Sequence, residues 1–518
     1  MDELFLWLTI FNRFRWVFCQ LETLRICLPQ NVRSVLKELP KSLDETYERM
    51  LNEIGQVNPH QAYRLLQCLT VATRPLRVEE LAEVLALDFD KANDGIPALN
   101  KDWRWDDQKQ GILSTCSSLI AIVDEADGFS FTRVVQFAHF SVKEFLTSDR
   151  LSKLEGEISR FHIRLEPAHT VIAQACLAIL LQSDFIDVSD PGSPLYNYAA
   201  QHWVGHSQFE NVSSRVEDGM RRLFDPLKPR FAAWLKSHNM DEEWHSFLLG
   251  HSGLVNYDYY AFLQKPASSI EDCAPLCLYY ASLCGFTDIT KYLISEHPQY
   301  VNARVGYNKS PLVAGLLNKH WQVAELLHRN GAVVDVTSYN GRTPLHAASE
   351  EGLVDVARWL LDHGANPNLQ EHDHSIPLHL AAAKGRLEIV RTLLEYSVDV
   401  NAVKKNNRTS LHEASERGHI DILRLLIQYK ADVTPHIQDL LSLASSSGSV
   451  ETVQFFIKLG ADVNSPDGSN SAALHMASCM GHTNIVKLLI EHGADINARD
   501  GSDKTPLHSA LSPVSAII

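Results

Sequence analysis

The sequence has few positive charges and no basic run, and this absence narrows the classes of partner. Among its 518 residues, 47 are Lys or Arg and 63 are Asp or Glu, which gives a net charge of −16. Proteins that bind nucleic acid or anionic membranes gain affinity by neutralising phosphates with lysine and arginine. We therefore expect no nucleic-acid partner and no membrane partner, and a protein partner becomes the default.

Long apolar runs and paired cysteines are also absent. No unbroken stretch reaches the ~18 apolar residues of a membrane span. The short run from Leu4 to Phe11 follows acidic residues, where a signal peptide would carry basic ones. The nine cysteines are odd in number, scattered, and never spaced as Cys-x-x-Cys. This use of cysteine is typical of a reducing compartment, so the sequence predicts an intracellular, cytoplasmic protein with buried structural thiols.

Catalytic and metal-binding patterns are missing as well. The chain has no His-Glu-x-x-His pair for zinc. The segment Gly250-His251-Ser252-Gly253 resembles a nucleophile elbow, but Leu254 follows it and no apolar strand leads into it. Ser141 lies near His139 in sequence, but catalysis would also need an orienting group and an oxyanion hole. We predict a chain that is not an enzyme and has no catalytic residue, cofactor or metal site.

What the sequence does contain is an internal repeat in its second half. One equivalent leucine per unit recurs at steps of 34, 33, 33, 33, 30, 33 and 33 residues. These leucines are Leu278, Leu312, Leu345, Leu378, Leu411, Leu441, Leu474 and Leu507. A period of this size indicates a solenoid. The best-preserved unit has Thr343-Pro344-Leu345-His346 and then Gly352, and it resembles the ankyrin consensus in residue identity and spacing.

Each recurring position of the unit has a mechanical role. Thr343 is expected to cap the first helix, and Pro344 fits its first turn because a missing N–H is harmless there. The ankyrin resemblance implies that His346 and its equivalents are hydrogen-bonding groups between units. Gly352 and its equivalents lie between the two helices, where a left-handed backbone is needed. A single unit has no closed core, so its stability comes from stacking.

Several units depart from this pattern. Lys319 replaces the glycine between helices in the second unit, and His374 replaces the glycine before the fourth unit's first helix. The sixth unit has Asp439-Leu440-Leu441-Ser442 in place of Thr-Pro-Leu-His, after a turn three residues short. The eighth opens with Thr505-Pro506-Leu507-His508 and is truncated. We expect these units to be the looser ones in an array of about seven repeats and a truncated eighth.

The first half reads as helices followed by a β-hairpin. Ser42-Leu43-Asp44-Glu45 predicts a helix start, and Leu65 and Leu81 belong to two further helices separated by Pro75. Two β-rich runs meet at Asp127-Gly128, a hairpin signal. Helix, turn, helix and hairpin form a winged-helix pattern. The second helix carries glutamates that oppose an approach to phosphates, so we favour a structural or relay role over DNA reading.

Three segments then carry a family resemblance. The stretches at residues 14–24 (Phe-Arg-Trp-Val-Phe-Cys-Gln-Leu-Glu-Thr-Leu), 39–49 and 138–146 resemble the region after the nucleotide-binding module of fungal NACHT–ankyrin proteins, NOD-like receptors of the STAND class. The winged helix resembles one named after an inositol deacylase. The resemblance implies a signalling protein with four parts. They are a NACHT tail with a linker helix (1–58), a winged-helix-like domain (59–150), a helical connector (151–265) and the ankyrin repeats (266–518).

The nucleotide switch of that family requires a phosphate-binding loop, Gly-x-x-x-x-Gly-Lys-Ser/Thr, and the sequence has none. The nearest match is Gly306-Tyr307-Asn308-Lys309-Ser310, which lacks the glycine before lysine and falls in an ankyrin finger. ATP binding is therefore not carried over from the family.

Together these features predict a mostly α protein, in which a winged-helix-like domain and a helical connector precede an ankyrin α-solenoid with short β-hairpin fingers. We interpret it as a non-catalytic scaffold or sensor that binds a protein partner of unknown identity. Three alternatives stay open: a fragment of an ATP-dependent NOD-like receptor, a hydrolase with its site in residues 151–265, and a transcriptional regulator.

The ankyrin resemblance places partner binding on the concave face, formed by the finger tips and the exposed ends of the first helices. In the third to fifth units this geometry selects residues of both charge signs and one aromatic. The candidates are Tyr339, Arg342, Glu350, Glu351, His372, Asp373, Lys384, Lys405, Arg408, Glu416 and Arg417. Their side chains are expected to be free of structural roles, and tyrosine and arginine are common among hot-spot residues.

The missing phosphate-binding loop leads to a direct test. We expect isothermal titration of the chain with Mg-ATP to give no heat of binding, because no run of backbone amides is available to hold the phosphates. Binding at micromolar affinity would contradict this prediction.

Overall fold

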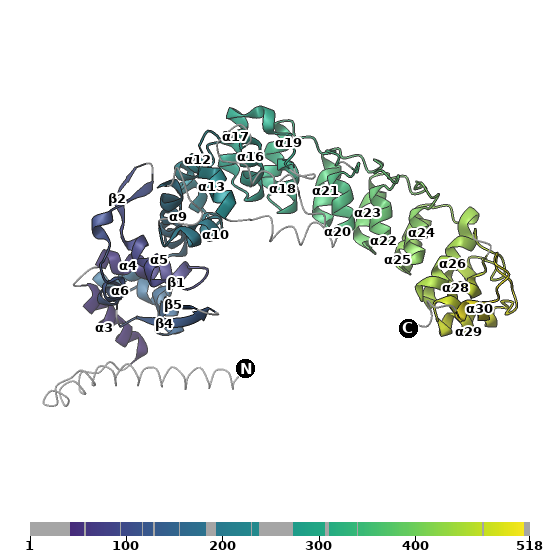
Figure 1. Ribbon diagram of the computed structural model, residues 1–518, viewed down its shortest axis with the longest axis horizontal. Helices are drawn as coiled ribbons and strands as arrows, with labels where there is room; N and C mark the ends of the chain where they lie inside the picture. The colour runs from purple at the N-terminus through teal and green to yellow at the C-terminus, as the bar shows by residue number, and fades with distance from the viewer. Residues whose placement is uncertain are drawn as a thin grey trace. The chain divides into compact units, whose positions relative to one another are not determined.

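The computed structural model describes residues 42–55, 59–93, 95–116, 118–127, 130–154, 156–182, 193–228, 230–237, 273–305, 310–338, 340–468 and 471–511. The chain divides into two compact units, Met1–His297 and Pro298–Ile518, and each is described by itself (Figure 1). The family segment 14–24, the 250–254 motif and the predicted site residue Tyr339 lie outside the described residues. The domain boundaries proposed from sequence stay predictions.

The first described helix, α3 (Leu43–Gly55), begins as the sequence predicts. The hydroxyl of Ser42 accepts a hydrogen bond from the backbone N–H of Glu45 at 3.1 Å. Tyr47 and Leu51, one turn apart, are 3% and 0% exposed. The capping residue therefore fixes the start of the helix, and its apolar face turns to the core.

A winged helix follows, as predicted. Its helices are α4 (Pro59–Val71), α5 (Val78–Leu85) and α6 (Gln108–Cys116). Its strands β1 (Leu76–Arg77), β4 (Ile120–Asp127) and β5 (Ser130–Phe137) form an antiparallel sheet in the order β1-β5-β4. The β4–β5 register pairs Ile120 with Phe137 and Asp127 with Ser130, so the hairpin closes where the sequence placed its turn.

The sequence pattern missed two elements between α5 and the hairpin. One is a second hairpin, β2 (Leu87–Asn93) with β3 (Ile96–Leu99), and the other is helix α6. The amphipathic pattern of α6 is weak because only Ile112, Thr115 and Cys116 are buried. The sequence pattern predicted two helices before the β4–β5 hairpin, whereas the structure has three, α4, α5 and α6.

The glutamates of α5 have a different role from the one expected. Glu80 and Glu83 are 1% and 2% exposed, so they do not form a solvent-facing acidic surface. Arg74 donates two hydrogen bonds to Glu80, at 2.6 and 2.8 Å, and Arg104 pairs with Glu83. A buried carboxylate is tolerated when an arginine fork neutralises it. These pairs hold the helix within its domain.

Short helices complete the winged helix before the connector begins. They are α7 (Phe140–Leu146), α8 (Asp149–Ser152) and the 3₁₀ helix η3 (Glu157–Phe161). The connector helices are α9 (Leu165–Gln182), α10 (Tyr196–Ser207), α11 (Val212–Arg215), α12 (Glu217–Leu223) and α13 (Arg230–Ser237). The first ankyrin unit, α16 (Ala274–Leu283) with α17 (Thr287–Glu296), belongs to the same compact unit.

Helix α9 has the length and mean hydropathy of a membrane span, which the search for an unbroken apolar run did not anticipate. Of its 18 residues, 61% are buried inside the fold. Buried core helices of water-soluble domains pass the same test of length and composition. Packing against α4 and α10 accounts for its apolar character.

An aromatic cluster joins the connector to the first ankyrin unit. Trp203 and Trp234 are both 0% exposed, with ring centroids 5.3 Å apart. Trp203 also stacks on Phe286 at 5.4 Å, and Trp234 lies 6.3 Å from Tyr280. Both tryptophans belong to the core. The connector, whose role the sequence did not show, buries one face of the first repeat.

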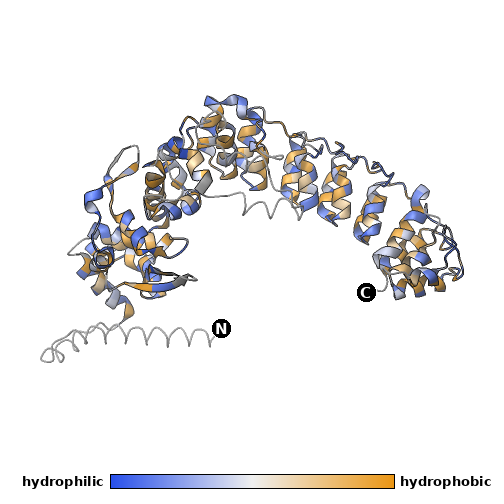
Figure 2. Ribbon diagram, viewed as in Figure 1, coloured by the Kyte–Doolittle hydropathy of each residue, from blue (hydrophilic) through white to orange (hydrophobic). Residues whose placement is uncertain are grey.

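Unit 2 consists of helix pairs, and in Figure 2 the helices are rich in hydrophobic residues while the loops at their ends are mostly hydrophilic. The first helices of the pairs are α18 (Pro311–Leu317), α20 (Pro344–Glu351), α22 (Pro377–Ala383), α24 (Ser410–Glu416), α26 (Ile437–Ser447), α28 (Ala473–Cys479) and α30 (Pro506–Ala510). The second helices are α19 (Trp321–Arg329), α21 (Val354–Asp362), α23 (Leu387–Glu395), α25 (Ile420–Gln428), α27 (Val450–Lys458) and α29 (Thr483–Glu491). From α20 to α30 each first helix packs on the next first helix, so stacking buries the repeated leucines from Leu345 to Leu474. In the parts of the fingers that the structure describes, the chain forms tight turns and no two-stranded hairpin.

Buried histidines join successive units, as the ankyrin resemblance implies. Nδ1 of His346 accepts a hydrogen bond from the N–H of Thr343 at 3.1 Å, and Nε2 lies 3.1 Å from the carbonyl oxygen of Ser375 in the next unit. Nε2 of His379 lies 3.0 Å from the carbonyl oxygen of Ala402. One ring therefore caps its own helix and bonds to the following repeat.

The irregular units show how each departure is accommodated. Gly352 has a φ of +83°, and Lys319 is held at +59° in the position where other units have glycine. His374 is likewise at +64°. In the sixth unit the hydroxyl of Ser442, which replaces the histidine, donates to Asp467 at 2.6 Å. A polar link between units is kept with different atoms, while the left-handed Lys319 and His374 carry backbone strain.

The leucines of the repeat provide a test of stacking. Leu378 is 0% exposed, so Leu378→Ala should lower the free energy of unfolding by about 2 to 5 kcal/mol through the cavity it leaves. Leu507, its equivalent in the last unit, is 70% exposed, and Leu507→Ala should change stability by less than about 0.5 kcal/mol. Urea unfolding of both variants measures the difference. Equal losses would mean that neighbours do not bury the mid-array leucine.

The buried histidines make stability depend on pH. Burial lowers the pKa of His346, His379 and His412 to about 4, against 6.5 for a free imidazole. Below pH 6.5 the unfolded chain binds protons that the folded chain does not, so their contribution is complete above 6.5 and is lost as the pH falls toward 4. Each pKa unit corresponds to about 1.4 kcal/mol.

Urea unfolding at about pH 7 and about pH 5 should therefore show a marked loss of stability on acidification. His379→Gln should reduce this loss, because one group that titrates differently in the two states is removed. The exposed His372 provides the matched control, and His372→Gln should leave the pH dependence as in the parent. The same pH dependence in all three proteins would show that the buried rings do not control it.

Candidate partner-binding surface

The predicted site residues lie on three successive fingers and on the helix ends beside them. A backbone hydrogen bond across the base closes each finger. These bonds run from Ser338 N–H to the Arg342 carbonyl (2.8 Å), from Glu371 N–H to the Ser375 carbonyl (2.9 Å), and from Lys404 N–H to the Arg408 carbonyl (2.9 Å). We call these fingers, with the C-terminal ends of α20, α22 and α24, the finger strip.

Backbone hydrogen bonds also run from finger to finger. His372 N–H donates to the carbonyl of Asn340 at 2.8 Å, and Lys405 N–H donates to the carbonyl of Asp373 at 2.9 Å. The fingers of the third, fourth and fifth units therefore form one connected surface. Rigid spacing of this kind limits the entropy lost when a partner binds.

Ion pairs bring the predicted residues of the third and fourth units together. Arg342 reaches from its finger to Glu350 at the end of α20, and its Nε lies 3.6 Å from Glu371. Lys384, at the end of α22, lies 3.4 Å from the same Glu350. Burial alone would raise the pKa of Glu350, but the hydrogen bond and charge of Arg342, together with Lys384, lower it below its ordinary value.

The fifth unit repeats this arrangement. Arg408 pairs with Glu416 at the end of α24, and its Nε lies 3.2 Å from Glu413. Lys404 lies 3.3 Å from Asp373 and 3.6 Å from Glu413. The finger arginine and the glutamate of the helix end are eight residues apart in both units, which brings the turn back over the end of its own helix.

These pairs correct one part of the sequence interpretation. Arg342, Glu350 and Arg408 are half-buried and paired, so their side chains are not free of structural roles. The exposed members of the predicted set are His372, Asp373, Lys384, Lys405 and Arg417, and Glu351 is half-buried. A partner would meet these exposed groups first.

Sequence reasoning missed three members of the network, Glu371, Lys404 and Glu413. Glu371 and Lys404 are 33 residues apart, so they occupy equivalent finger positions with opposite charges. Burial raises the pKa of Glu371 despite the nearby Arg342. The opposite charges of these two equivalent finger residues were the sequence signal that could have identified the network.

The serine and histidine considered for catalysis form a helix cap. Oγ of Ser141 lies 2.5 Å from Nδ1 of His139 and 2.8 Å from the hydroxyl of Tyr47. His139 is the N-cap of α7, and its ring accepts from the N–H of Ser141 at 3.3 Å. The cluster binds α3 to α7, so these side chains have a structural role.

One group of side chains in the described part of the chain has the composition of a metal site. His412, His436 and Asp439 each place a ligand atom within 4.8 Å of the others. They come from α24, from the 3₁₀ helix η6 (Thr434–His436) and from the first turn of α26. Sequence reasoning predicted no metal site, because this group has neither paired cysteines nor a His-Glu-x-x-His spacing.

Two family models match the chain. Ankyrin repeats match in three copies, at residues 278–371, 366–437 and 441–514. The winged helix domain of GPI inositol-deacylase matches at residues 47–163. The second model, by its description, covers the winged helix of that enzyme.

Two fungal relatives are similar over large parts of the chain. Azaphilone pigments biosynthesis cluster protein L of Monascus ruber is 33% identical over 319 residues, which are 58% of this chain and 61% of the relative. Vegetative incompatibility protein HET-E-1 of Podospora anserina is 23% identical over 238 residues, which are 40% of this chain and 16% of the relative. The chain thus spans less than two thirds of either relative.

Among solved structures, the ankyrin repeat domain of human ASB11 is similar. It is 25% identical with a TM-score of 0.36, and the match covers 40% of this chain and 93% of that domain.

Proposed function

Because the chain joins a winged helix of the GPI inositol-deacylase type to ankyrin repeats, as fungal NACHT–ankyrin proteins do, we propose that it is a non-catalytic scaffold or sensor. It binds a protein partner through the finger strip. Ankyrin repeats are protein-interaction modules. The assignment of binding to the finger strip of this array is our proposal.

The continuity of the finger strip is the observation that carries the proposal. Two finger-to-finger hydrogen bonds, at 2.8 and 2.9 Å, fix the spacing of three units. Exposed charges of both signs then project from a surface that is already ordered. A protein surface with complementary charges would be held in one register on it.

The exposed groups differ in how freely they can pair with a partner. Lys384 already shares Glu350 with Arg342, so a partner carboxylate would compete with an internal pair. Lys405 is tied through its backbone N–H, and its exposed side chain extends from the finger. Arg417 is exposed at the end of α24. Lys405 and Arg417 are therefore the cations we assign to an acidic patch on the partner.

The proposal includes a cytoplasmic, reducing location. The described thiols of Cys68, Cys116, Cys176, Cys277 and Cys284 are free and buried. Burial raises the pKa of Cys68 and of Cys116 to about 12, so these groups are protonated and unreactive at neutral pH. Such thiols fit the core of a protein that forms no disulfides.

A second candidate function is the sensor part of an ATP-dependent NOD-like receptor. Matches to longer relatives, of which this chain covers 61% and 16%, favour it. Sequencing the transcript upstream of the codon for Met1 separates the two candidates. A reading frame that continues into a phosphate-binding loop would make the ankyrin array the sensor of a nucleotide switch.

Charge reversal of the two assigned cations tests the finger strip. The variant Lys405→Glu with Arg417→Glu should weaken a partner isolated from extract of the source organism by about fivefold or more, equivalent to about 1 kcal/mol. The reason is the loss of two attractive contacts and the gain of two repulsive ones. Calorimetry or biolayer interferometry with the purified partner measures the affinity.

The matched control reverses two exposed cations on second helices, Arg391→Glu in α23 with Lys487→Glu in α29. It changes the net charge by the same amount, so it separates a local contact from general electrostatics. The control should keep the parent affinity. Equal weakening by both variants, or by neither, would place the partner elsewhere.

A further inference from the structure

The joint between the fifth and sixth ankyrin units differs from the other joints of unit 2. The repeated leucines Leu411 and Leu441 are 30 residues apart, whereas the neighbouring steps are 33. The three missing residues fall in the connection between α25 and α26, where η6 (Thr434–His436) replaces a finger turn. The short connection changes the surroundings of one buried histidine.

That histidine is His412, which is 4% exposed. Its Nδ1 accepts a hydrogen bond from the N–H of Thr409 at 3.0 Å, as in the other units. In three other units the equivalent Nε2 lies 3.0 to 3.1 Å from a carbonyl oxygen of the following repeat. Within the described ranges, no hydrogen bond reaches Nε2 of His412, because the finger that would supply the carbonyl is shortened.

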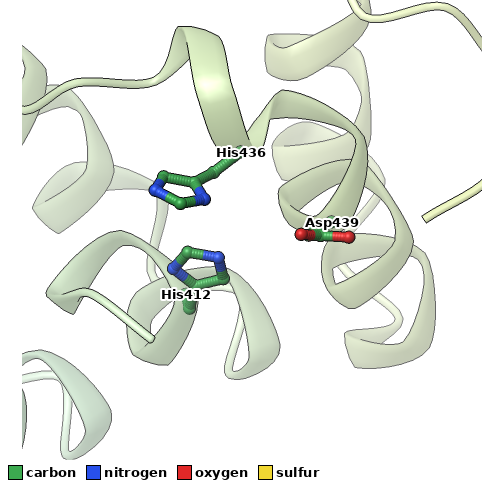
Figure 3. Close-up of side chains that lie close together, drawn as sticks. All are labelled: His412, His436 and Asp439. Atoms are coloured by element: carbon green, nitrogen blue, oxygen red, sulfur yellow. The ribbon is translucent and has the colours of Figure 1, made fainter. Parts of the chain in front are cut away.

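The side chains of His436 and Asp439 lie close to His412. The rings of His412 and His436 lie edge to face, with centroids 4.8 Å apart and an interplanar angle of 69°. Figure 3 shows the rings of His412 and His436 close together, with Asp439 to one side of them. Their ligand atoms all lie within 4.8 Å of one another.

The aspartate is held in place from the other side. Its Oδ1 accepts a hydrogen bond from the N–H of Gly468 at 2.7 Å. Within the part of the chain that the structure describes, its Oδ2 accepts no hydrogen bond. A carboxylate oriented by such a backbone hydrogen bond is typical of metal ligands, since outer partners fix the direction of the lone pairs.

We propose that His412, His436 and Asp439 form a zinc site that links the fifth ankyrin unit to the sixth. Two imidazole nitrogens and one carboxylate oxygen are donors that zinc accepts, and hard cations such as Mg²⁺ or Ca²⁺ prefer oxygen alone. Zinc bonds of about 2.0 to 2.2 Å require donors about 3.4 Å apart in a tetrahedron. A side-chain rotation of the half-buried His436 would shorten the present separation of up to 4.8 Å, while Asp439 keeps its hydrogen bond to Gly468.

Zinc binding also requires a change of tautomer at His412. The metal takes the lone pair of Nε2, so the proton moves to Nδ1 and is donated to the hydroxyl oxygen of Thr409, which lies 2.9 Å away. The bond from the N–H of Thr409 to Nδ1 is lost.

The site replaces a missing hydrogen bond by a metal link at the irregular joint. Three protein ligands leave a fourth position on the ion for water. The link ties α24 to the start of α26, so zinc should stabilise the folded array by binding it and not the unfolded chain. This inference does not rest on the proposed partner surface.

Zinc titration of the full chain, freed of metal by dialysis against a chelator, tests the site. Wild type should bind one zinc ion whose affinity falls at least tenfold in His436→Gln and in Asp439→Asn. Both replacements keep the approximate size and the polarity of the side chain, and the amide oxygen introduced by Asp439→Asn can still accept from the N–H of Gly468. The exposed His372 lies on another finger, and His372→Gln should bind zinc like wild type.

Two further readouts distinguish a built site from scattered binding by the other histidines. Zinc should raise the melting temperature of wild type and of His372→Gln but not of the two site variants. Cobalt should give a visible absorption band of low-symmetry coordination in the first two proteins only. No zinc binding by wild type, or equal binding and equal stabilisation in all four proteins, would overturn the proposal.

Discussion

The stacking of one helix pair on the next is the contact on which the ankyrin part depends. A single pair has one apolar side on each helix and no closed core. In unit 2, Leu345, Leu378 and Leu411 are 0 to 1% exposed only because the neighbouring pairs cover them. Leu507 has no following pair among the described residues, and it is 70% exposed. The same residue type thus contributes to stability or not according to its neighbours.

Polar links set the register of this stacking. The ring of His346 fills two roles at once, since Nδ1 caps its own helix and Nε2 meets the following unit. Burying a polar ring is tolerated because both nitrogens have partners. Where the sequence changes, the polar contact changes too: Ser442 donates to Asp467, and the ring of His412 lies against that of His436. Irregular units are therefore places where new chemistry can arise without loss of the fold.

In the compact unit Met1–His297, aromatic packing holds neighbouring elements together as the polar links do between repeats. Trp203, Trp234 and Phe286 bring the connector and the first repeat into one core. Glu80 and Glu83 would be costly inside the winged helix, but Arg74 and Arg104 neutralise them. Both examples show that a residue's sequence character does not by itself give its environment. The glutamates that the sequence placed on a surface are buried and form ion pairs.

The sequence by itself determined the repeat, the capping residues, the hairpin β4–β5 and the family of the array, because these features depend on local spacing. It also selected the fingers that form the strip. The tertiary structure alone decided helix α6, the aromatic contact between Trp203 and Phe286, and the pairing of Arg408 with Glu413 and Glu416. It likewise brought His412 to His436 and Asp439 across a shortened turn. Contacts between residues distant along the chain depend on how the elements pack, and the periodicity of a sequence carries no information about which side chains then meet.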